Sequence, residues 1–358
     1  MEVGRIMKRW LKILVTLGTL LMAFGWVQQT VHAESVGYSV SAVLPKNQDD
    51  KKVTYFALRV KPKQQQKLTI VIRNTSKSMK RFQVGVNQAI TNDNGVIDYS
   101  KANPTLDSSL KVGIKDVFSK DSTQKVNVPA KSSKRVSVSY TMPAEKIDGM
   151  ILGGVYVKQL TDSDNSSAKK GVTIKNAFAY VIGVRLRESS VDVAPDMRLH
   201  TVKAGQINSY NQIQANLQNP RPGLMSELKI KSKVTKANET KTVLSNEKSN
   251  MSMAPNSNFN YSIPWGGTQL KAGEYTLTLD AYAKGGYHWH FVKNFNVTQA
   301  QINQLKNKIN TPQQNNYLWW FVAGGILILL LLIVIIYLLM KNRRRDDDSA
   351  SDKTDSTK

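Results

Sequence analysis

Two histidines near the C-terminal end of the chain have a spacing that could contribute to a metal site. His288 and His290 are separated by one residue, so on a β-strand both imidazoles point to the same side. Two ligands without a third make an incomplete site, and a surface strand with polar rings explains the same pattern. The sequence therefore predicts no metal and no other cofactor.

The chain contains few residues that could act as a catalytic nucleophile or as an imidazole acid–base group. The chain contains no cysteine and four histidines, none of which belongs to a Gly-x-Ser-x-Gly context. The glycine-rich segment 149–154 lacks the Lys-Ser/Thr pair and helix that a phosphate-binding loop needs. Two carboxylates of a glycoside hydrolase could lie far apart in the chain, so that arrangement stays open. We expect a protein that is not an enzyme.

A polar turn early in the chain is one candidate binding site. Asn47 and Gln48 follow Pro45, and their amides could form hydrogen bonds with a glycan or a peptide. Asn and Pro also stabilise turns through their own backbone preferences. Both explanations remain open for this segment.

A second polar cluster contains Thr91, Asn92 and Asn94, followed by Gly95. Its hydroxyl and amides could bind sugar, whereas the Asn-Gly pair is also typical of a tight hairpin turn. Calcium prefers several carboxylate ligands, and this cluster contains only Asp93. We therefore favour turn structure and keep Thr91, Asn92 and Asn94 as candidate binding residues.

Tyr287 and Trp289 are the third candidate, because aromatic rings of this kind form platforms for sugars or protein partners. Tryptophan is also an ordinary residue of sandwich cores, and that explanation applies to Trp265 as well as Trp289. The candidate side chains must be positioned by a folded scaffold. The pattern of apolar and polar residues between them indicates what that scaffold is.

The chain between residues 34 and 160 is rich in short runs in which apolar and polar residues alternate. Such runs bury one face of a β-strand and expose the other. Strands of this length without helical stretches between them indicate a β-sandwich. The runs are 38–43, 55–60, 67–73, 82–87 and 135–140. Residues 161–174 then form a linker or a long hairpin tip.

Residues 175–298 repeat this pattern, beginning with the alternating run 180–186. We therefore predict an all-β protein with two immunoglobulin-like β-sandwich domains in tandem. Residues 299–317 follow as a short helical stalk and a polar spacer, with an apolar stripe at Ile302, Leu305 and Ile309.

The first 33 residues have the composition of a signal peptide. Basic residues precede an apolar stretch at 13–24 that is too short to span a bilayer comfortably. We expect cleavage between Ala33 and Glu34, with translation starting at Met1 or Met7. An uncleaved anchor is the alternative.

Residues 318–340 contain no charge and are long enough for a transmembrane helix. Arginines at 343–345 follow at once, which predicts a cytoplasmic tail at 341–358 and an ectodomain facing the cell wall. No Leu-Pro-x-Thr-Gly motif precedes the helix. The sequence therefore predicts a single-pass protein of the cell membrane.

Positive charge dominates the chain, with 50 Lys and Arg residues against 26 Asp and Glu. This field favours polyanions, and outside a bacterial membrane these are wall polymers rather than nucleic acid. Lysines that only maintain solubility are the alternative. The absence of cysteine fits an exported bacterial protein whose cores need no disulfides.

Segments of both predicted domains resemble the WxL-interacting proteins of Gram-positive bacteria. The segments that carry the resemblance are 44–48, 55–58, 87–99, 142–143, 149–154, 176–184, 253–257, 273–275, Trp265, Trp289 and Phe291. The resemblance implies a peptidoglycan-binding domain at 34–160 and a host-binding domain at 175–298.

This resemblance implies a membrane-anchored surface protein that attaches to peptidoglycan and WxL-domain proteins and presents a host- or partner-binding domain for adhesion. The expected partners are peptidoglycan or an anionic wall polymer, WxL-domain proteins and host extracellular proteins. The alternative is a structural assembly factor that docks other exported proteins without binding wall polymer itself.

Overall fold

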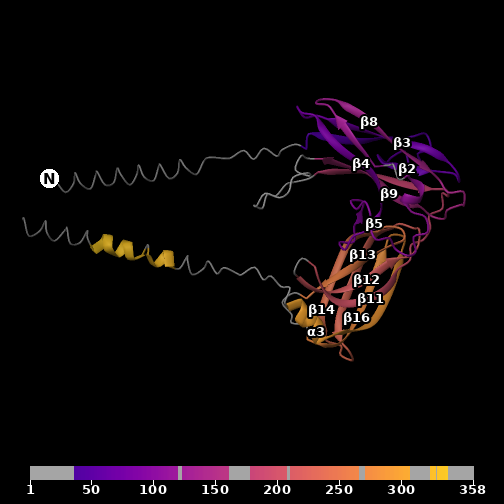
Figure 1. Ribbon diagram of the computed structural model, residues 1–358. Coiled ribbons are helices and arrows are strands. Elements are labelled where there is room, and N and C mark those ends of the chain that lie inside the picture. The colour runs from indigo at the N-terminus through magenta and orange to yellow at the C-terminus, as the bar shows by residue number, and fades with distance from the viewer. Residues whose placement is uncertain are drawn as a thin grey trace, which may run out of the picture.

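The computed structural model describes residues 36–119, 123–160, 178–207, 210–265, 271–306, 323–327 and 329–337. Regular structure in these residues is mainly β-strand, which confirms the all-β prediction. The predicted signal peptide with its cleavage site, the linker 161–174 and the tail 341–358 lie outside the described residues. Figure 1 shows two β-rich domains, one upstream and one downstream in the chain.

The first domain consists of two sheets that share one core. The smaller sheet has the order β1-β3-β8, with β1 (Tyr38–Val43), β3 (Gln65–Asn74) and β8 (Ser133–Thr141). The larger sheet has the order β2-β10-β9-β4-β7, with β2 (Phe56–Arg59), β10 (Ala179–Arg187), β9 (Ile151–Leu160), β4 (Lys80–Gln88) and β7 (Gln124–Val128).

The alternating pattern of β8 explains why its sequence forms a sandwich strand. Val136, Val138 and Tyr140 are buried in the core, whereas Arg135 and Ser137 between them are exposed. Burying one apolar face of each strand against the opposite sheet is the main source of stability in such a fold.

Strand β10 corrects the expected domain boundary. We expected residues 180–186 to open the second domain, but β10 pairs antiparallel with β9 and parallel with β2. Val184 and Leu186 are fully buried in the first core. Alternation predicts a strand, whereas the choice of partner depends on which core accepts its apolar face.

The second domain also has two sheets around one core. One sheet has the order β11-β12-β15, with β11 (Arg198–Ile207), β12 (Tyr210–Asn219) and β15 (Ser257–Pro264). The other has the order β14-β13-β16-β17, with β14 (Thr242–Met253), β13 (Met225–Lys236), β16 (Gly273–Ala283) and β17 (Tyr287–Val297). Trp265 is buried in this core, as the sequence predicted.

A short hairpin of the first domain connects the two domains. It consists of β5 (Ile90–Thr91) and β6 (Ile97–Asp98), and β5 contacts β14 and β15 of the second domain. Figure 1 shows β5 between the two domains. Ala89, Leu152 and Ala254 form a small buried cluster across the junction. The short helix α2 (Ile114–Val117) packs nearby against β4 and β9. The domains are therefore joined by packed surface as well as by the chain.

The predicted helical stalk is present as α3 (Gln299–Lys306), but it packs against the second domain. Ile302 and Leu305 are buried in the second core, which explains these two members of the apolar stripe, whereas Ile309 lies outside the described residues. Further along, residues 323–327 and 329–337 are helical. In the part of the chain that the structure describes, no helix is both long and apolar enough to cross a membrane.

Candidate functional site

The candidate residues Asn47 and Gln48 connect their turn to neighbouring strands of the first domain through hydrogen bonds. Asn47 Nδ2 donates to the backbone oxygen of Arg59 at 2.9 Å and to Gln66 Oε1 at 3.0 Å. Gln48 Nε2 donates to the backbone oxygen of Tyr55 at 2.7 Å. These hydrogen bonds tie both amides to residues in or beside β2 and β3, and ligand binding by Asn47 and Gln48 stays a prediction.

The next residue, Asp49, belongs to an ion-pair network that ties this turn to β2 and β10. Its carboxylate lies 2.7 Å from Arg59 and 2.5 Å from Arg187. Burial would raise the pKa of Asp49, but the hydrogen bonds from Arg59 and Arg187 outweigh it and lower the pKa. The network fastens β10 to the first domain.

Thr91 lies in the junction between the domains instead of at an open surface. Its side chain is buried, and its hydroxyl is 2.6 Å from the hydroxyl of Ser257. The same Oγ1 accepts a 3.0 Å hydrogen bond from the backbone N–H of Ala254. Groups of the second domain therefore occupy its hydroxyl, and ligand binding by Thr91 stays a prediction.

Asn92 and Asn94 form the turn of the same hairpin. Asn92 Oδ1 accepts hydrogen bonds from the backbone N–H groups of Asn94 at 3.0 Å and Val96 at 3.2 Å. Gly95 has φ +70°, and a Cβ there would stand 2.6 Å from Met251 Sδ. The Asn-Gly signal thus marks a turn that presses on the second domain, and sugar binding by Asn92 and Asn94 stays a prediction.

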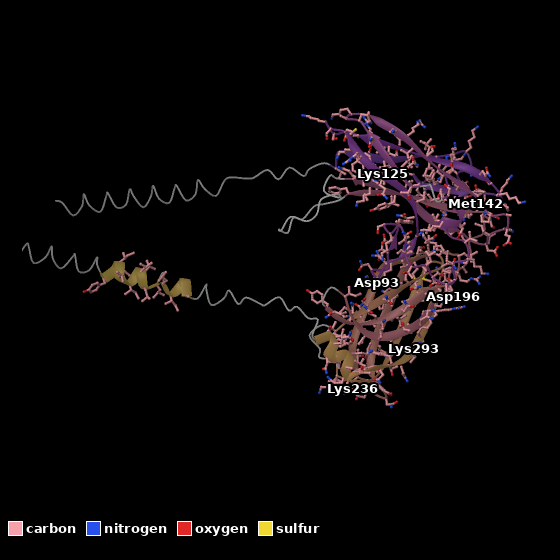
Figure 2. The ribbon with its side chains drawn as sticks, viewed as in Figure 1. Asp93, Lys125, Met142, Asp196, Lys236 and Lys293 are labelled. Atoms are coloured by element: carbon pink, nitrogen blue, oxygen red, sulfur yellow. The ribbon has the colours of Figure 1, made fainter. Side chains whose placement is uncertain are left out.

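Sequence reasoning missed Asp107, which connects the two domains. Its carboxylate accepts hydrogen bonds from Gln218 Nε2 at 2.7 Å and Asn258 Nδ2 at 2.5 Å. Burial would raise the pKa of Asp107, but the hydrogen bonds from Ser109, Asn258 and Gln218 together lower it. Asp93 supports the same contact by accepting from the Asn260 N–H at 2.9 Å, and Figure 2 shows it at the junction.

Tyr287 and Trp289 lie side by side on β17 with ring centroids 5.9 Å apart. Both rings are partly buried, and Trp289 packs against the edge of the second core without belonging to its buried residues. Its Nε1 donates to Asp196 at 3.2 Å. Binding of an external partner by these rings stays a prediction.

The opposite side of β17 carries the two histidines. His290 and His288 contact Asp280 Oδ1 at 2.8 and 3.2 Å, and Tyr282 stacks on His288 with ring centroids 4.4 Å apart. The hydrogen bond from His290, followed by that from His288, lowers the pKa of Asp280. Among the described residues, no group of three or more His, Cys, Asp or Glu side chains could hold a metal ion.

The outward face of β1, β3 and β8 is the strongest candidate for polymer binding, and we name it the hydroxyl face. None of these three strands contains an acidic residue. Cross-strand pairing places serine and threonine hydroxyls beside basic side chains. The outward residues are Ser39, Ser41, Val43, Lys67, Thr69, Val71, Arg73, Ser133, Arg135, Ser137, Ser139 and Thr141.

The chemistry of the hydroxyl face suits a hydroxylated and anionic polymer. Each hydroxyl donates and accepts hydrogen bonds, and Thr69 already pairs with Ser137 at 2.8 Å across the strands. Lys67, Arg73 and Arg135 are exposed and attract carboxylates or phosphates. The alternating pattern predicted these strands but did not single out their outward faces.

Among solved structures, the chain is similar to assembly chaperones of bacterial pili and fimbriae. The CupB2 chaperone of Pseudomonas aeruginosa gives a TM-score of 0.26 at 12% identity, covering 63% of this chain and 91% of that one. The DraB chaperone of E. coli gives a TM-score of 0.24 at 13% identity, covering 66% of this chain and 98% of that one. The CsuC–CsuE pre-assembly complex of Acinetobacter baumannii gives a TM-score of 0.29 at 12% identity, covering 65% of this chain and 91% of that one. These low scores support no functional argument.

Comparison with curated proteins finds no match. Two models of a single family, however, match consecutive parts of the chain. Residues 38–159 match the peptidoglycan binding domain of the WxL Interacting Protein, and residues 169–307 match its host binding domain. The two matches span most of the chain and follow the order that the sequence resemblance predicted. The chain therefore belongs to the WxL-interacting protein family.

Proposed function

We propose that this protein is a membrane-anchored cell-surface binding protein, with no enzymatic activity. Its first domain attaches to peptidoglycan, it associates with WxL-domain proteins, and its second domain presents a host- or partner-binding surface. Family membership and the order of the two matched regions support this proposal. We also propose that both domains are immunoglobulin-like, supported in the second by three strands packed against four.

The observation that carries wall binding is the composition of the hydroxyl face. Peptidoglycan combines glycan hydroxyls with stem-peptide amides and carboxylates. The face offers hydroxyls that pair with the former, and Lys67, Arg73 and Arg135 that pair with the carboxylates. The lack of Asp and Glu in β1, β3 and β8 removes repulsion of an anionic polymer.

Membrane anchoring rests on the amino-acid sequence. Residues 318–340 carry no charge, and arginines 343–345 follow them. An anchor at this position holds the ectodomain beside the wall, which raises its effective concentration so that weak contacts suffice. Protease added to wall-stripped cells should then remove residues 36–306 and spare the tail.

A sedimentation assay tests wall binding by the hydroxyl face. The full-length protein, purified in detergent, is mixed with insoluble peptidoglycan at low salt. The double variant Arg73→Glu/Arg135→Glu should lose most of its retention, because it repels the stem carboxylates. The matched variant Lys101→Glu/Lys125→Glu has the same charge change elsewhere on the first domain and should retain binding. Equal retention of both variants would refute the assignment of the face.

The second candidate is a structural assembly factor that docks exported proteins while a partner binds the wall. Strand β17 favours it, because among the described residues this strand pairs only with β16 and lies at the edge of its sheet. An open edge can accept a strand from another protein. Co-purification of a WxL-domain protein from wall-free membranes, together with no sedimentation on peptidoglycan, would favour this candidate over wall binding.

A further inference from the structure

The outward side of β12 and β15 in the second domain is unusually rich in amides. Strand β12 alternates buried Ile213, Ala215 and Leu217 with outward amide residues. The register of β12 with β15 brings further amides beside them. We name this surface the amide face, and its residues are Gln212, Gln214, Asn216, Gln218, Asn258, Asn260 and Ser262.

Part of the amide face has a structural role. Asn216 Nδ2 donates to Asn260 Oδ1 at 3.1 Å and to Asn258 Oδ1 at 3.3 Å. Gln218 and Asn258 also donate to Asp107 of the first domain. These bonds account for the end of the face that meets the junction, but they leave its other end unexplained.

The remaining end carries polar groups that lack partners within the described residues. Gln212 is 6% exposed, yet its Nε2 has no hydrogen-bond partner there, and neither does the buried Oγ of Ser262. No hydrogen bond joins the Gln214 side chain to another residue of the described chain. A buried amide without a partner destabilises the folded state, so its presence calls for an explanation beyond stability.

Other side chains make this end suitable for a sugar chain. Tyr210 lies beside it at the start of β12 and is 77% exposed, so its ring offers an apolar surface to the C–H groups of a sugar. Lys203 pairs with Gln214 in the register and is also exposed. Strands β12 and β15 contain no acidic residue.

We propose that the amide face binds a glycan chain that contains N-acetylhexosamine and belongs to a host glycoprotein. Amide side chains both donate and accept, so they match the acetamido group and the hydroxyls of such a sugar. Gln214 is partly exposed and supplies an amide to the sugar, with the buried unpaired groups of Gln212 and Ser262 beside it in the sheet, and Tyr210 supplies the stacking surface. This inference deepens the proposed host-binding role and rests on it.

The decisive variant is Gln212→Leu, because it separates binding from stability. Leucine removes the unpaired amide, so the unfolding midpoint in urea should stay constant or rise. If Gln212 serves only the fold, the same substitution gives no change in glycan binding. Combined with Gln214→Ala, it should weaken binding of the glycan at least tenfold. Asn296→Leu replaces an exposed amide on the other sheet and should leave binding unchanged.

The full-length protein is tested on an immobilised N-glycan that ends in galactose and N-acetylglucosamine, and separately on N-acetylglucosamine tetramer. Wild-type protein should bind both, and the double variant should bind each at least tenfold more weakly. No wild-type binding, or equal binding by the variants, would overturn the inference. Peptidoglycan sedimentation is measured in parallel. If the double variant loses sedimentation instead, the face serves the wall and the host assignment is wrong. If only glycan binding fails, the proposed wall attachment stands.

Discussion

The hydroxyl of Thr91 in the first domain lies 2.6 Å from the hydroxyl of Ser257 in the second. The two residues are 166 positions apart in the chain. Ala254 donates its N–H to the same threonine, so one side chain satisfies two groups of the other domain. This arrangement makes the domain junction a specific interface, and its consequences can be measured.

Replacing Thr91 with valine should weaken the junction. The substitution keeps the shape of the side chain but leaves the buried N–H of Ala254 without an acceptor, which costs about 1–3 kcal/mol. Urea unfolding monitored by circular dichroism measures the loss. The control is Thr69→Val, which removes a similar Thr–Ser pair at an exposed site and should cost less than about 0.5 kcal/mol. Equal losses would contradict the role of Thr91.

Stability should depend on the ionisation of Asp107. Its folded-state pKa is lower than its ordinary value, so the carboxylate stabilises the protein above about pH 4. This contribution is lost as pH falls through the folded pKa and the hydrogen bonds from Gln218 and Asn258 weaken. Unfolding midpoints measured between neutral and acid pH should fall steeply for the wild type. Asp107→Asn should be less stable at neutral pH and lose part of this slope; an unchanged slope would refute the prediction.

Gly149 should not tolerate alanine. Its φ is +69°, and a Cβ would lie 2.3 Å from the backbone oxygen of Pro222 in the second domain. The left-handed conformation alone costs alanine about 1–2 kcal/mol. Gly286→Ala is the matched control, because its φ is +80° and nothing lies within 4 Å of the added Cβ. The melting temperature of Gly149→Ala should fall at least twice as far; a smaller fall would argue against close contact at the junction.

Leu186→Ala tests the assignment of β10 to the first domain. Leu186 is fully buried in the first core, so its truncation should cost about 2–5 kcal/mol. Hydrogen exchange followed by mass spectrometry should show faster exchange in β2 and β9. Leu217→Ala, equally buried in the second core, should instead accelerate β12 and β15. Faster exchange of β12 in the Leu186 variant would contradict the assignment.

The polar clusters show where sequence reasoning succeeds. Asn92, Asn94 and Gly95 form the turn that their residue types predict, because turn chemistry is local and involves neighbouring backbone groups. The second role of this turn, pressing on Met251, depends on a residue far along the chain. No residue near Thr91 in the sequence indicates that its hydroxyl forms a hydrogen bond with Ser257.

The family match and the structure divide the chain at different points. The model of the host binding domain matches from residue 169, and the sequence reading also began the second domain before β10. Yet β10 completes the larger sheet of the first domain. Both readings follow the order of residues in the chain, whereas sheet membership follows the core in which Val184 and Leu186 are buried.

The sequence by itself determined the β-rich class, most strands, the inward and outward faces of the strands that alternate, and the family. It could do so because side chains alternate with a period of two residues, which is a local property of an extended backbone. The tertiary structure alone decided that β10 joins the first domain, that Thr91 and Asp107 connect the domains, and which outward residues gather into the hydroxyl and amide faces. Strands pair through backbone groups that are the same at every residue, so only the packing of distant side chains selects the partners.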